Sequence, residues 1–252
     1  MDSVKKNIVG LIPTRLNSLR LPQKALLEIQ GIPLMIHTYR RSLMSKKLTD
    51  LYICCDDKKI FDIAKKFKAK CIMTSKNHTN GTERIAEGVM KLKKKFDLVV
   101  DIQGDEPLLS PFHIDQVINY HLKNLNSDII LPTLKIKPTN NTNIVKVIKN
   151  KSNRVMYLTR ANIPFEFKQN KKFVYKHLSI ISFKPNALIK FAKSKKTYHE
   201  NIEDVELLRA LDLDMHIKSI NLKGDSFSID VLDDFKIAQK KMLNDKYFKI
   251  YR

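Results

Sequence analysis

The sequence predicts an α/β protein with a mostly parallel central sheet and a smaller antiparallel excursion in its second half. Short apolar, β-branched runs alternate with segments of helical spacing through the first half of the 252 residues, and this alternation is typical of βαβ units. The second half holds several strands with short connections, which favour antiparallel pairing. A hydrophobic content of 43% is that of a globular chain, and this length can bury a large core.

The first half supplies the expected parallel strands and crossover helices. Strands are predicted at residues 7–13, 51–55, 71–73 and 98–102, and helices at 33–43, 57–67, 82–92 and 111–121. Pro33 suits the first turn of its helix, and Thr82 is the expected N-cap of the third. Polar segments at 14–24 and 103–107 follow strands directly. Because ligands bind beyond the carboxyl ends of parallel strands, we expect both segments at one edge of the sheet.

The second half continues with strands and then returns to helices. Strands are predicted at residues 129–136, 144–148, 155–159, 176–183 and 216–222, and helices at 203–213 and 233–242. The sequence has no internal repeat and no low-complexity linker, so residues 1–252 are expected to form one domain.

The charge is strongly positive, with 47 Lys+Arg against 26 Asp+Glu, a formal net charge of +21. A basic nucleic-acid-binding protein is therefore one function class to weigh. Nine of the cations are arginines and the other 38 are lysines, whereas bidentate recognition of bases and phosphates favours arginine. We expect lysines scattered over the surface and no bound nucleic acid, and the basic-protein alternative stays open.

The three cysteines and the lengths of the apolar runs indicate the cellular compartment in which the protein is expected. Cys54, Cys55 and Cys71 lack metal-ligand spacing and cannot form a disulfide framework, so they are expected to be buried thiols in a reducing cytosol. No segment approaches the roughly 20 apolar residues of a membrane helix. The first apolar run, residues 8–12, is shorter than the apolar region of a signal peptide. A soluble, cytoplasmic protein without membrane association is expected.

The segment after the first strand, residues 13–24, carries Arg15, Arg20 and Lys24 among many backbone donors. Backbone amides that cradle oxygens, with cations that offset charge, are what a triphosphate needs. The segment has neither the Walker pattern nor the dinucleotide fingerprint. An ordinary basic surface loop is the alternative.

Two carboxylates follow predicted strands and are candidate metal ligands. Asp105 lies in Gln103-Gly104-Asp105-Glu106-Pro107, and Asp230 ends Ser228-Ile229-Asp230. Mg²⁺ is commonly held by one or two carboxylates plus substrate phosphates. A simple turn is the alternative for the first motif. A helix cap is the alternative for Asp230, although Asp233 or Asp234 suits that cap as well.

These motifs, taken in order, resemble one known family. Gln103–Pro107 is identical to the QGDEP motif of the 3-deoxy-manno-octulosonate (KDO) cytidylyltransferases, and Arg20-Leu21-Pro22-x-Lys24 looks like their nucleotide loop. The resemblance covers nearly the whole chain. It also includes Met73-Thr74, His78-x-x-Gly81-Thr82-Glu83-Arg84, Asn143-x-Val145-Lys146-Val147, Tyr157-x-x-Arg160-Ala161-x-Ile163-Pro164, His177-Leu178 and Glu203-x-x-x-x-Leu208-Arg209.

The resemblance implies a Rossmann-like nucleotidyltransferase fold that transfers CMP from CTP to a 2-keto-3-deoxy sugar acid, for lipopolysaccharide or other surface polysaccharide. It implies Mg²⁺ on Asp105 and Asp230, with Lys24 and Arg15 completing the catalytic set. Residues 1–125 would bind mainly the nucleotide, 126–225 the sugar and a second copy in a homodimer, and 226–252 would return with the second metal ligand. The implied nucleotide-binding residues are Pro13, Thr14, Arg15, Ser18, Arg20, Lys24, Gly81, Thr82, Arg84 and Asp105. The implied sugar-binding residues are Gln103, Arg160, His177 and Glu203, with Glu206 a weaker match than Glu203.

The departures from the family pattern lie mostly among the implied sugar-side residues. Ser179 and Ile181 stand where the family has Gly and Tyr, and Phe165 stands for Trp. Losing a hydroxyl partner changes substrate choice strongly, so CTP is better supported than KDO. Alternative acceptors are 8-amino-KDO or another sugar acid. His177 has a second interpretation as a hydrogen-bonded structural histidine. A homologue that binds nucleotide without turnover is a further alternative, because glycine and threonine are missing around Asp230.

Overall fold

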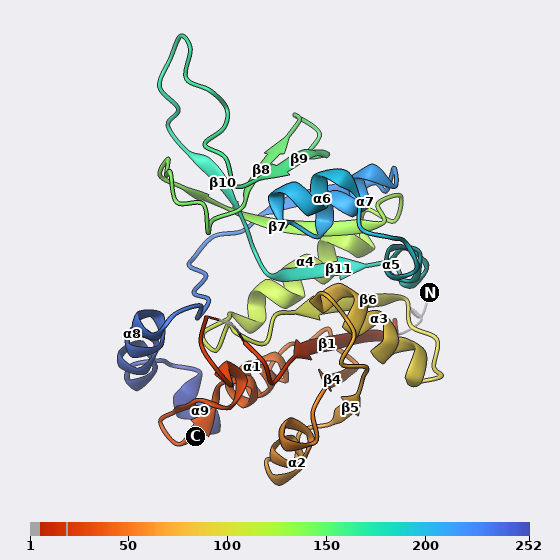
Figure 1. The fold of residues 1–252 in the computed structure, drawn as a ribbon, viewed down its shortest axis with the longest axis vertical. Helices are drawn as coiled ribbons and strands as arrows, with labels where there is room; N and C mark the ends of the chain where they lie inside the picture. Colours follow the sequence, from red (N-terminus) through yellow and green to blue (C-terminus); the bar gives the residue numbers. More distant parts are fainter. Residues whose placement is uncertain (1–5, 19) are drawn as a thin grey trace. The chain divides into compact units, whose positions relative to one another are not determined.

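The computed structural model describes residues 6–18 and 20–252 and divides the chain into two compact units. The first unit contains the chain up to Gln116 together with Ser226–Arg252, and the second is Val117–Asp225. The segment after residue 225 therefore folds with the start of the chain. In sequence colouring, its helices are blue and lie in the same unit as red and orange elements (Figure 1).

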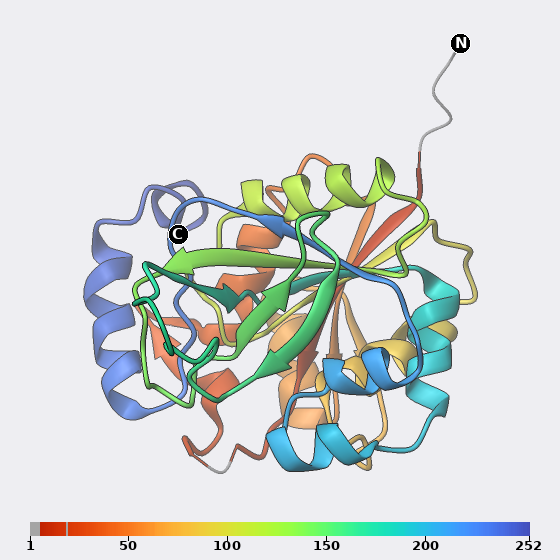
Figure 2. The ribbon, with the colours of Figure 1, turned by 90° about the horizontal axis from the view of Figure 1, so that it is seen from above.

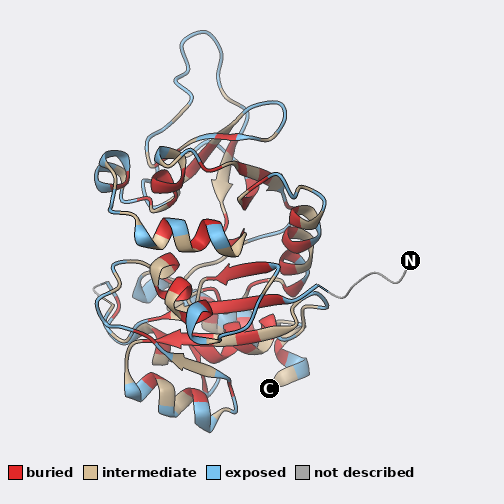
Figure 3. Ribbon diagram, turned by 90° about the vertical axis from the view of Figure 1, so that its right-hand side faces the viewer, coloured by how far each residue is buried: buried red, intermediate tan, exposed pale blue. Residues whose placement is uncertain are grey.

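The first unit is built on a parallel sheet, as the sequence predicts. Its strands run in the order β5 (Cys71–Met73), β4 (Asp50–Cys55), β1 (Ile8–Thr14) and β6 (Leu98–Ile102). β1 pairs in parallel with β4 and β6, and β4 with β5. Val9, Leu11 and Ile12 have no exposed surface, because a central parallel strand is covered on both faces. The central strands β1 and β6 consist almost entirely of buried residues, drawn in red in the burial view (Figure 3).

Helices connect these strands and complete the first unit. They are α1 (Leu34–Ser42), α2 (Lys58–Lys66), α3 (Gly81–Lys91), α8 (Leu232–Leu243) and α9 (Phe248–Tyr251), while α4 (Pro111–Leu122) crosses the boundary between the units. A short hairpin of β2 (Glu28–Ile29) and β3 (Ile32–Pro33) precedes α1. The predicted cap of α3 is wrong. Asn80 is the N-cap and accepts a 2.8 Å hydrogen bond from Glu83 N, whereas Thr82 is fully buried in the first turn.

A buried arginine ties the carboxyl end of the chain to α1. Arg41 is 2% exposed and donates to Leu109 O at 2.6 Å, Leu108 O at 3.0 Å and Asp245 Oδ1 at 2.6 Å. His37, one turn earlier, bonds Tyr251 Oη and Ile29 O, each at 2.8 Å. These contacts anchor α9 and also the backbone that follows the motif at 103–107.

The second unit contains the predicted antiparallel strands (Figure 2). Its central strand β7 (Ile129–Ile136) pairs antiparallel with β10 (Val174–His177) and β11 (Ile180–Phe183) and parallel with β12 (Ile217–Asn221). β8 (Lys146–Lys149) pairs antiparallel with β9 (Val155–Thr159) and with β10. Parallel β12 is the one departure from antiparallel pairing among these described strands.

One predicted strand of the second unit is divided in two, and one predicted helix is shorter than expected. The strand expected at 176–183 is β10 and β11, interrupted at Leu178 and Ser179. The helix expected at 203–213 forms only as α7 (Leu207–Asp212), and Glu203 instead ends a helix that was not predicted, α6 (Tyr198–Glu203). The chain turns between the two helices at Asp204, which adopts a left-handed conformation with φ of 49°. A further helix, α5 (Pro185–Lys193), was not predicted, although proline occupies its first turn.

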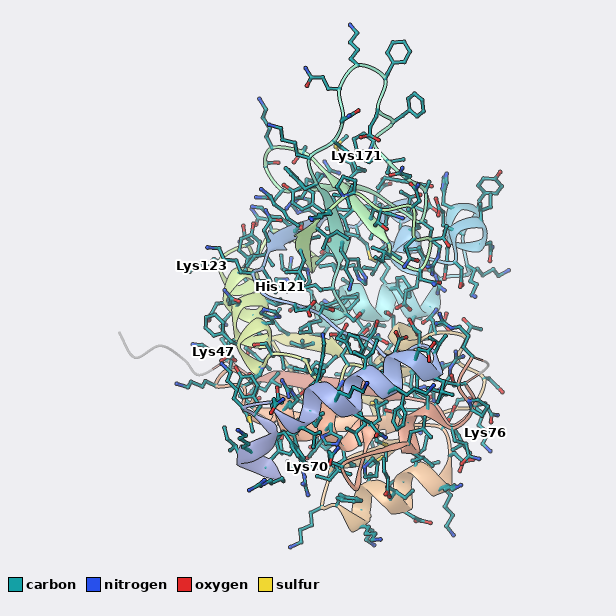
Figure 4. The ribbon with its side chains drawn as sticks, turned by 90° about the vertical axis from the view of Figure 1, so that its left-hand side faces the viewer. Lys47, Lys70, Lys76, His121, Lys123 and Lys171 are labelled. Carbon is teal, nitrogen blue, oxygen red and sulfur yellow. The ribbon has the colours of Figure 1, made fainter. Side chains whose placement is uncertain are left out.

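The surface carries many separated lysines. Lys47, Lys70 and Lys76 are exposed in the first unit (Figure 4). Several lysines pair with carboxylates, such as Lys70 with Asp50 and Lys76 with Asp57, each at 3.5 Å. None of the helices in the described part of the chain has the length and apolar character needed to span a membrane.

Candidate functional site

Three of the predicted motifs meet around Pro13, at the carboxyl ends of β1 and β6. A Cβ on Gly104 would lie 3.0 Å from Pro13 O and 3.2 Å from Thr14 Oγ1. A Cβ on Gly81 would lie 3.1 Å from Pro13 Cγ and 3.2 Å from Gln103 Nε2. Glycine fits both positions closely, because a Cβ would press on the Pro13 backbone oxygen at Gly104 and on side-chain atoms of Pro13 and Gln103 at Gly81. The expectation that segments 14–24 and 103–107 share one edge of the sheet is confirmed.

Lys24 is the centre of the polar cluster at this edge. Its Nζ lies 2.7 Å from Asp105 Oδ2, 2.6 Å from Ile229 O and 3.5 Å from Asp230 Oδ1. The lysine side chain is 15% exposed and the two carboxylates are 28% and 30% exposed. One ammonium group therefore joins both predicted metal ligands, at the rim of the buried sheet. Arg20, which is exposed, adds a 2.8 Å ion pair to Asp230 Oδ1.

The segment that carries Asp230 is held against the motif at 103–107 by one backbone and one side-chain hydrogen bond. Ile229 N donates to Asp105 O at 3.0 Å, and Ser226 Oγ donates to Glu106 Oε1 at 3.2 Å. Asp234 Oδ2 accepts from the amides of Asp230 and Val231 at 2.9 and 3.1 Å. Asp234 thus serves the start of α8, as one alternative predicted, and the Asp230 carboxylate is left to face Lys24.

The loop after β1 is held from behind by a residue that the sequence reasoning missed. Asp56, which follows β4, accepts from Leu16 N at 3.0 Å through Oδ1 and from Arg84 at 3.1 Å through Oδ2. Arg84 is 3% exposed and also donates to Thr74 Oγ1 and Ser75 O. Its guanidinium is therefore engaged with protein groups. Arg15, by contrast, is exposed on the loop. An acidic residue directly after the second parallel strand was the signal that could have revealed Asp56.

The turn that leads into α3 is fixed by two acids of that helix. Glu83 accepts from Thr79 N at 3.1 Å and from Asn80 Nδ2 at 3.0 Å. Glu87 accepts from Ser75 N at 2.8 Å and pairs with His78 Nε2. Burial acts to raise the pKa of Glu87, but hydrogen bonds from Lys91, the Ser75 amide and His78 outweigh it and lower that pKa to about 2. Gly81 and Thr82 are thereby held at the start of α3.

In the second unit, Arg160 and Glu203 lie together, as the resemblance implies. Glu203 accepts from Thr159 Oγ1 at 2.5 Å and from Arg160 N at 2.9 Å. Arg160 donates to Glu203 O, Thr142 O and Asp204 O at 2.8 to 3.0 Å. Lys146, 1% exposed, lies beneath and donates to Asn141 O and Arg160 O at 2.8 Å each. Gln103 belongs to the first unit, where its Nε2 donates to Asp101 Oδ2 at 3.0 Å.

His177, also in the second unit, has a buried ring nitrogen. Nε2 is buried, and no described residue offers it a hydrogen bond. Burial, with the nearby charges of Lys176 and Arg160, lowers the pKa of His177 to about 4, so the ring is neutral at pH 7. The interpretation as a hydrogen-bonded structural histidine is therefore wrong for this atom. Native proteins rarely leave a buried polar atom unpaired, so this nitrogen is unusual.

Comparisons with known proteins agree with the geometry. A family model described as cytidylyltransferase matches residues 9–218. A 3-deoxy-manno-octulosonate cytidylyltransferase of Thermodesulfovibrio yellowstonii is 36% identical over 248 residues, covering 92% of this chain and 96% of that protein. An 8-amino-3,8-dideoxy-manno-octulosonate cytidylyltransferase of Shewanella sediminis is 34% identical, covering 95% of this chain and 100% of that protein.

Among solved structures, a CMP:2-keto-3-deoxy-manno-octonic acid synthetase complexed with CTP is similar throughout. The TM-score is 0.88 at 26% identity, over 94% of this chain and 98% of that one. The predicted Rossmann-like nucleotidyltransferase fold is confirmed by this likeness.

Proposed function

Because the chain belongs to the cytidylyltransferase family, we propose that it transfers CMP from CTP to the anomeric hydroxyl of a 2-keto-3-deoxy sugar acid, with KDO as acceptor. The observation that carries this proposal is the cluster in which Lys24 joins Asp105 and Asp230. It lies beyond the carboxyl ends of parallel strands, where ligands bind in such sheets.

The nucleotide is assigned to the first unit. Exposed Arg15 and Arg20, with Lys24, offer cations to a triphosphate, and Ser18 together with the Pro13–Thr14 backbone lines the same loop. Gly81 and Thr82 lie at the start of α3, where amides without helical partners favour an anion. Arg84 is buried and bonded to Asp56, so we assign it the positioning of the loop in place of direct phosphate contact.

The carboxylates suit a divalent cation. Enzymes of this family are generally metal-dependent, and we propose Mg²⁺ as the ion. Asp105 and Asp230 already converge on one cationic group, Lys24 Nζ, and two carboxylates completed by phosphate oxygens are a typical magnesium donor set. Bound there, the metal would neutralise triphosphate charge and orient the reacting groups.

The reaction itself needs no protein nucleophile. The anomeric hydroxyl oxygen forms a bond to the α-phosphorus of CTP, the bond to the β-phosphate oxygen breaks, the hydroxyl proton leaves, and pyrophosphate departs. Charge builds on phosphate oxygens, so positioning and electrostatic stabilisation by Lys24 and Arg15 supply the catalysis.

The sugar acid is assigned to Arg160, His177 and Glu203 of the second unit. Gln103, the fourth residue that the resemblance implies for the sugar, belongs to the first unit. Support comes from the unpartnered His177 Nε2 and from the paired Arg160 and Glu203. The same relatives include both KDO and 8-amino-KDO enzymes. 8-Amino-KDO is therefore the alternative acceptor, particularly because Ser179 and Ile181 depart from the family pattern.

A pyrophosphate-release screen tests the proposal. It pairs CTP, UTP, ATP and GTP with KDO, 8-amino-KDO and sialic acid in the presence of Mg²⁺. We expect turnover with CTP and one acceptor. Turnover with no pair would overturn the proposal and favour nucleotide binding alone. Oligonucleotide binding that falls steeply with salt would instead favour the basic-protein alternative.

The metal assignment has its own test. Asp105→Asn keeps the shape of the side chain and removes its charge, and we expect a loss of turnover of at least about 100-fold that extra Mg²⁺ only partly restores. Asp115→Asn, on α4, is the matched control, because Asp115 accepts from Ser45 and Lys47 N away from the cluster. Unchanged turnover in Asp105→Asn would refute the metal role. We further propose a homodimeric, cytoplasmic enzyme that supplies surface polysaccharide synthesis.

A further inference from the structure

Three sulfur atoms converge on one face of the first unit's sheet. Cys55 belongs to β4, and Cys71 and Met73 belong to β5. Cys55 Sγ lies 3.3 Å from Cys71 Sγ and 3.4 Å from Met73 Sδ. The parallel register pairs Ile53 with Cys71 and Cys55 with Met73, so the three sulfur-bearing side chains point to the same face. This thiol–thioether cluster is defined by Cys55, Cys71 and Met73.

The cluster can be reached from the edge of the sheet. β5 is the last strand in the first unit's strand order. Met73 is 38% exposed and Cys71 is part-exposed, while Cys55 is buried behind them. Within residues 6–18 and 20–252, no three His, Cys, Asp or Glu side chains are placed to share a metal ion. The cluster therefore offers sulfur donors in place of the mixed donor set of a zinc site.

We propose that Cys55, Cys71 and Met73 form a binding site for one soft monovalent cation of the Cu(I) type. Soft thiolate and thioether ligands select Cu(I), whereas structural Zn²⁺ takes four ligands in a tetrahedron. On binding, the cation forms a bond to each sulfur, and both thiol protons are released to solvent. No electron is transferred. The site is separate from the residues assigned to CMP transfer, so its test does not depend on turnover.

The experiment is an anaerobic Cu(I) titration of the full chain against a chromophoric Cu(I) chelator, with ascorbate as reductant. We expect one Cu(I) per chain, with three sulfur ligands by X-ray absorption. Cys55→Ala and Cys71→Ala should each weaken binding by more than about 100-fold, because even the loss of an outer partner of a metal ligand costs 10- to 100-fold. Met73→Leu should weaken binding less and lower the sulfur count by one.

Cys54→Ala is the matched control. Cys54 is the adjacent residue of β4, but its Sγ lies against α3, 2.5 Å from where a Cβ on Gly88 would stand, on the opposite face of the sheet. The Cys54→Ala variant should therefore bind Cu(I) with the same affinity as the parent chain. Circular dichroism identifies any variant that is unfolded, and Met73→Leu, at an exposed position, keeps the test independent of core packing. Equal Cu(I) affinity in Cys71→Ala and the parent, or equal sulfur counts in Met73→Leu and the parent, would overturn the proposal.

Discussion

The ammonium group of Lys24 contacts both Asp105 and Asp230. Replacing Lys24 with methionine should therefore lower the stability of the fold and also leave the two carboxylates without their shared cation. Lys24→Met removes charge-assisted hydrogen bonds to Asp105 Oδ2 and Ile229 O. At about 1.5 kcal/mol each, the lower end for partly exposed charged groups, the free energy of unfolding should fall by about 3 kcal/mol. For a chain of this size, that loss lowers Tm by about 6–12 °C.

The same change uncovers a cation site. Without the ammonium, Asp105 and Asp230 lose the cation that they share, and Arg20 remains paired with Asp230. Mg²⁺ should therefore stabilise Lys24→Met more than the parent chain in the absence of nucleotide. A concentration 100 times the Kd contributes about 2.7 kcal/mol, which is nearly the stability lost. Turnover should still fall by about 10²- to 10³-fold, as for other removed charge-stabilising donors.

The assay is thermal unfolding with and without Mg²⁺, against NaCl of equal ionic strength. Lys47→Met, at an exposed position outside the cluster, is the matched control and should leave both Tm and the Mg²⁺ response unchanged. If Mg²⁺ raises the Tm of Lys24→Met no more than that of the parent, the two carboxylates do not share a cation and the reasoning fails.

Three further outcomes follow from buried groups of the first unit. Arg41→Met should lower the free energy of unfolding by about 3–5 kcal/mol in denaturant titrations, because it leaves Asp245 without its buried partner. The control Arg252→Met, at an exposed position, should leave the free energy of unfolding unchanged. Burial lowers the pKa of His37 to about 4, so the native state binds fewer protons than the unfolded state, whose pKa is about 6.5. The contribution of neutral His37 to the free energy of unfolding is therefore fully present above pH 6.5, and it falls toward pH 4 by up to about 1.4 kcal/mol per pH unit. In urea titrations at several pH values, His37→Gln should make the free energy of unfolding less dependent on pH in this range. Asp56→Ala should raise the KM for CTP about tenfold in steady-state kinetics, since it releases Leu16 N; an unchanged KM would show that the loop does not depend on this anchor.

Much of the architecture could be predicted from local pattern. The strands at 71–73, 98–102, 129–136 and 155–159 have the predicted bounds, because short β-branched runs flanked by polar residues specify buried strands strongly. Elements were missed where tertiary contacts override local spacing. The helix predicted at 203–213 forms only over Leu207–Asp212, because the chain turns at Asp204. The buried pair of Arg209 and Glu200 joins this helix to α6, which was not predicted.

The candidate site was predicted in part. The motifs of the site and their order could be identified from the sequence, because Gln103–Pro107 and the loop ending at Lys24 are unusual local sequences. The roles of Asp56 and Lys146 were not, because each is defined by a partner from a different segment of the chain.

The sequence by itself determined the alternation of strands and helices, the edge of the sheet at which ligands bind, and the family. Tertiary structure decided which side chains meet. Lys24 and Ile229 are in contact although 205 residues separate them, Arg84 is turned inward onto Asp56, and Cys55 meets Cys71 and Met73 across a strand pair. The physical reason is that local propensity depends on neighbours along the chain, whereas charge pairing and metal coordination depend on distances that only the folded chain sets.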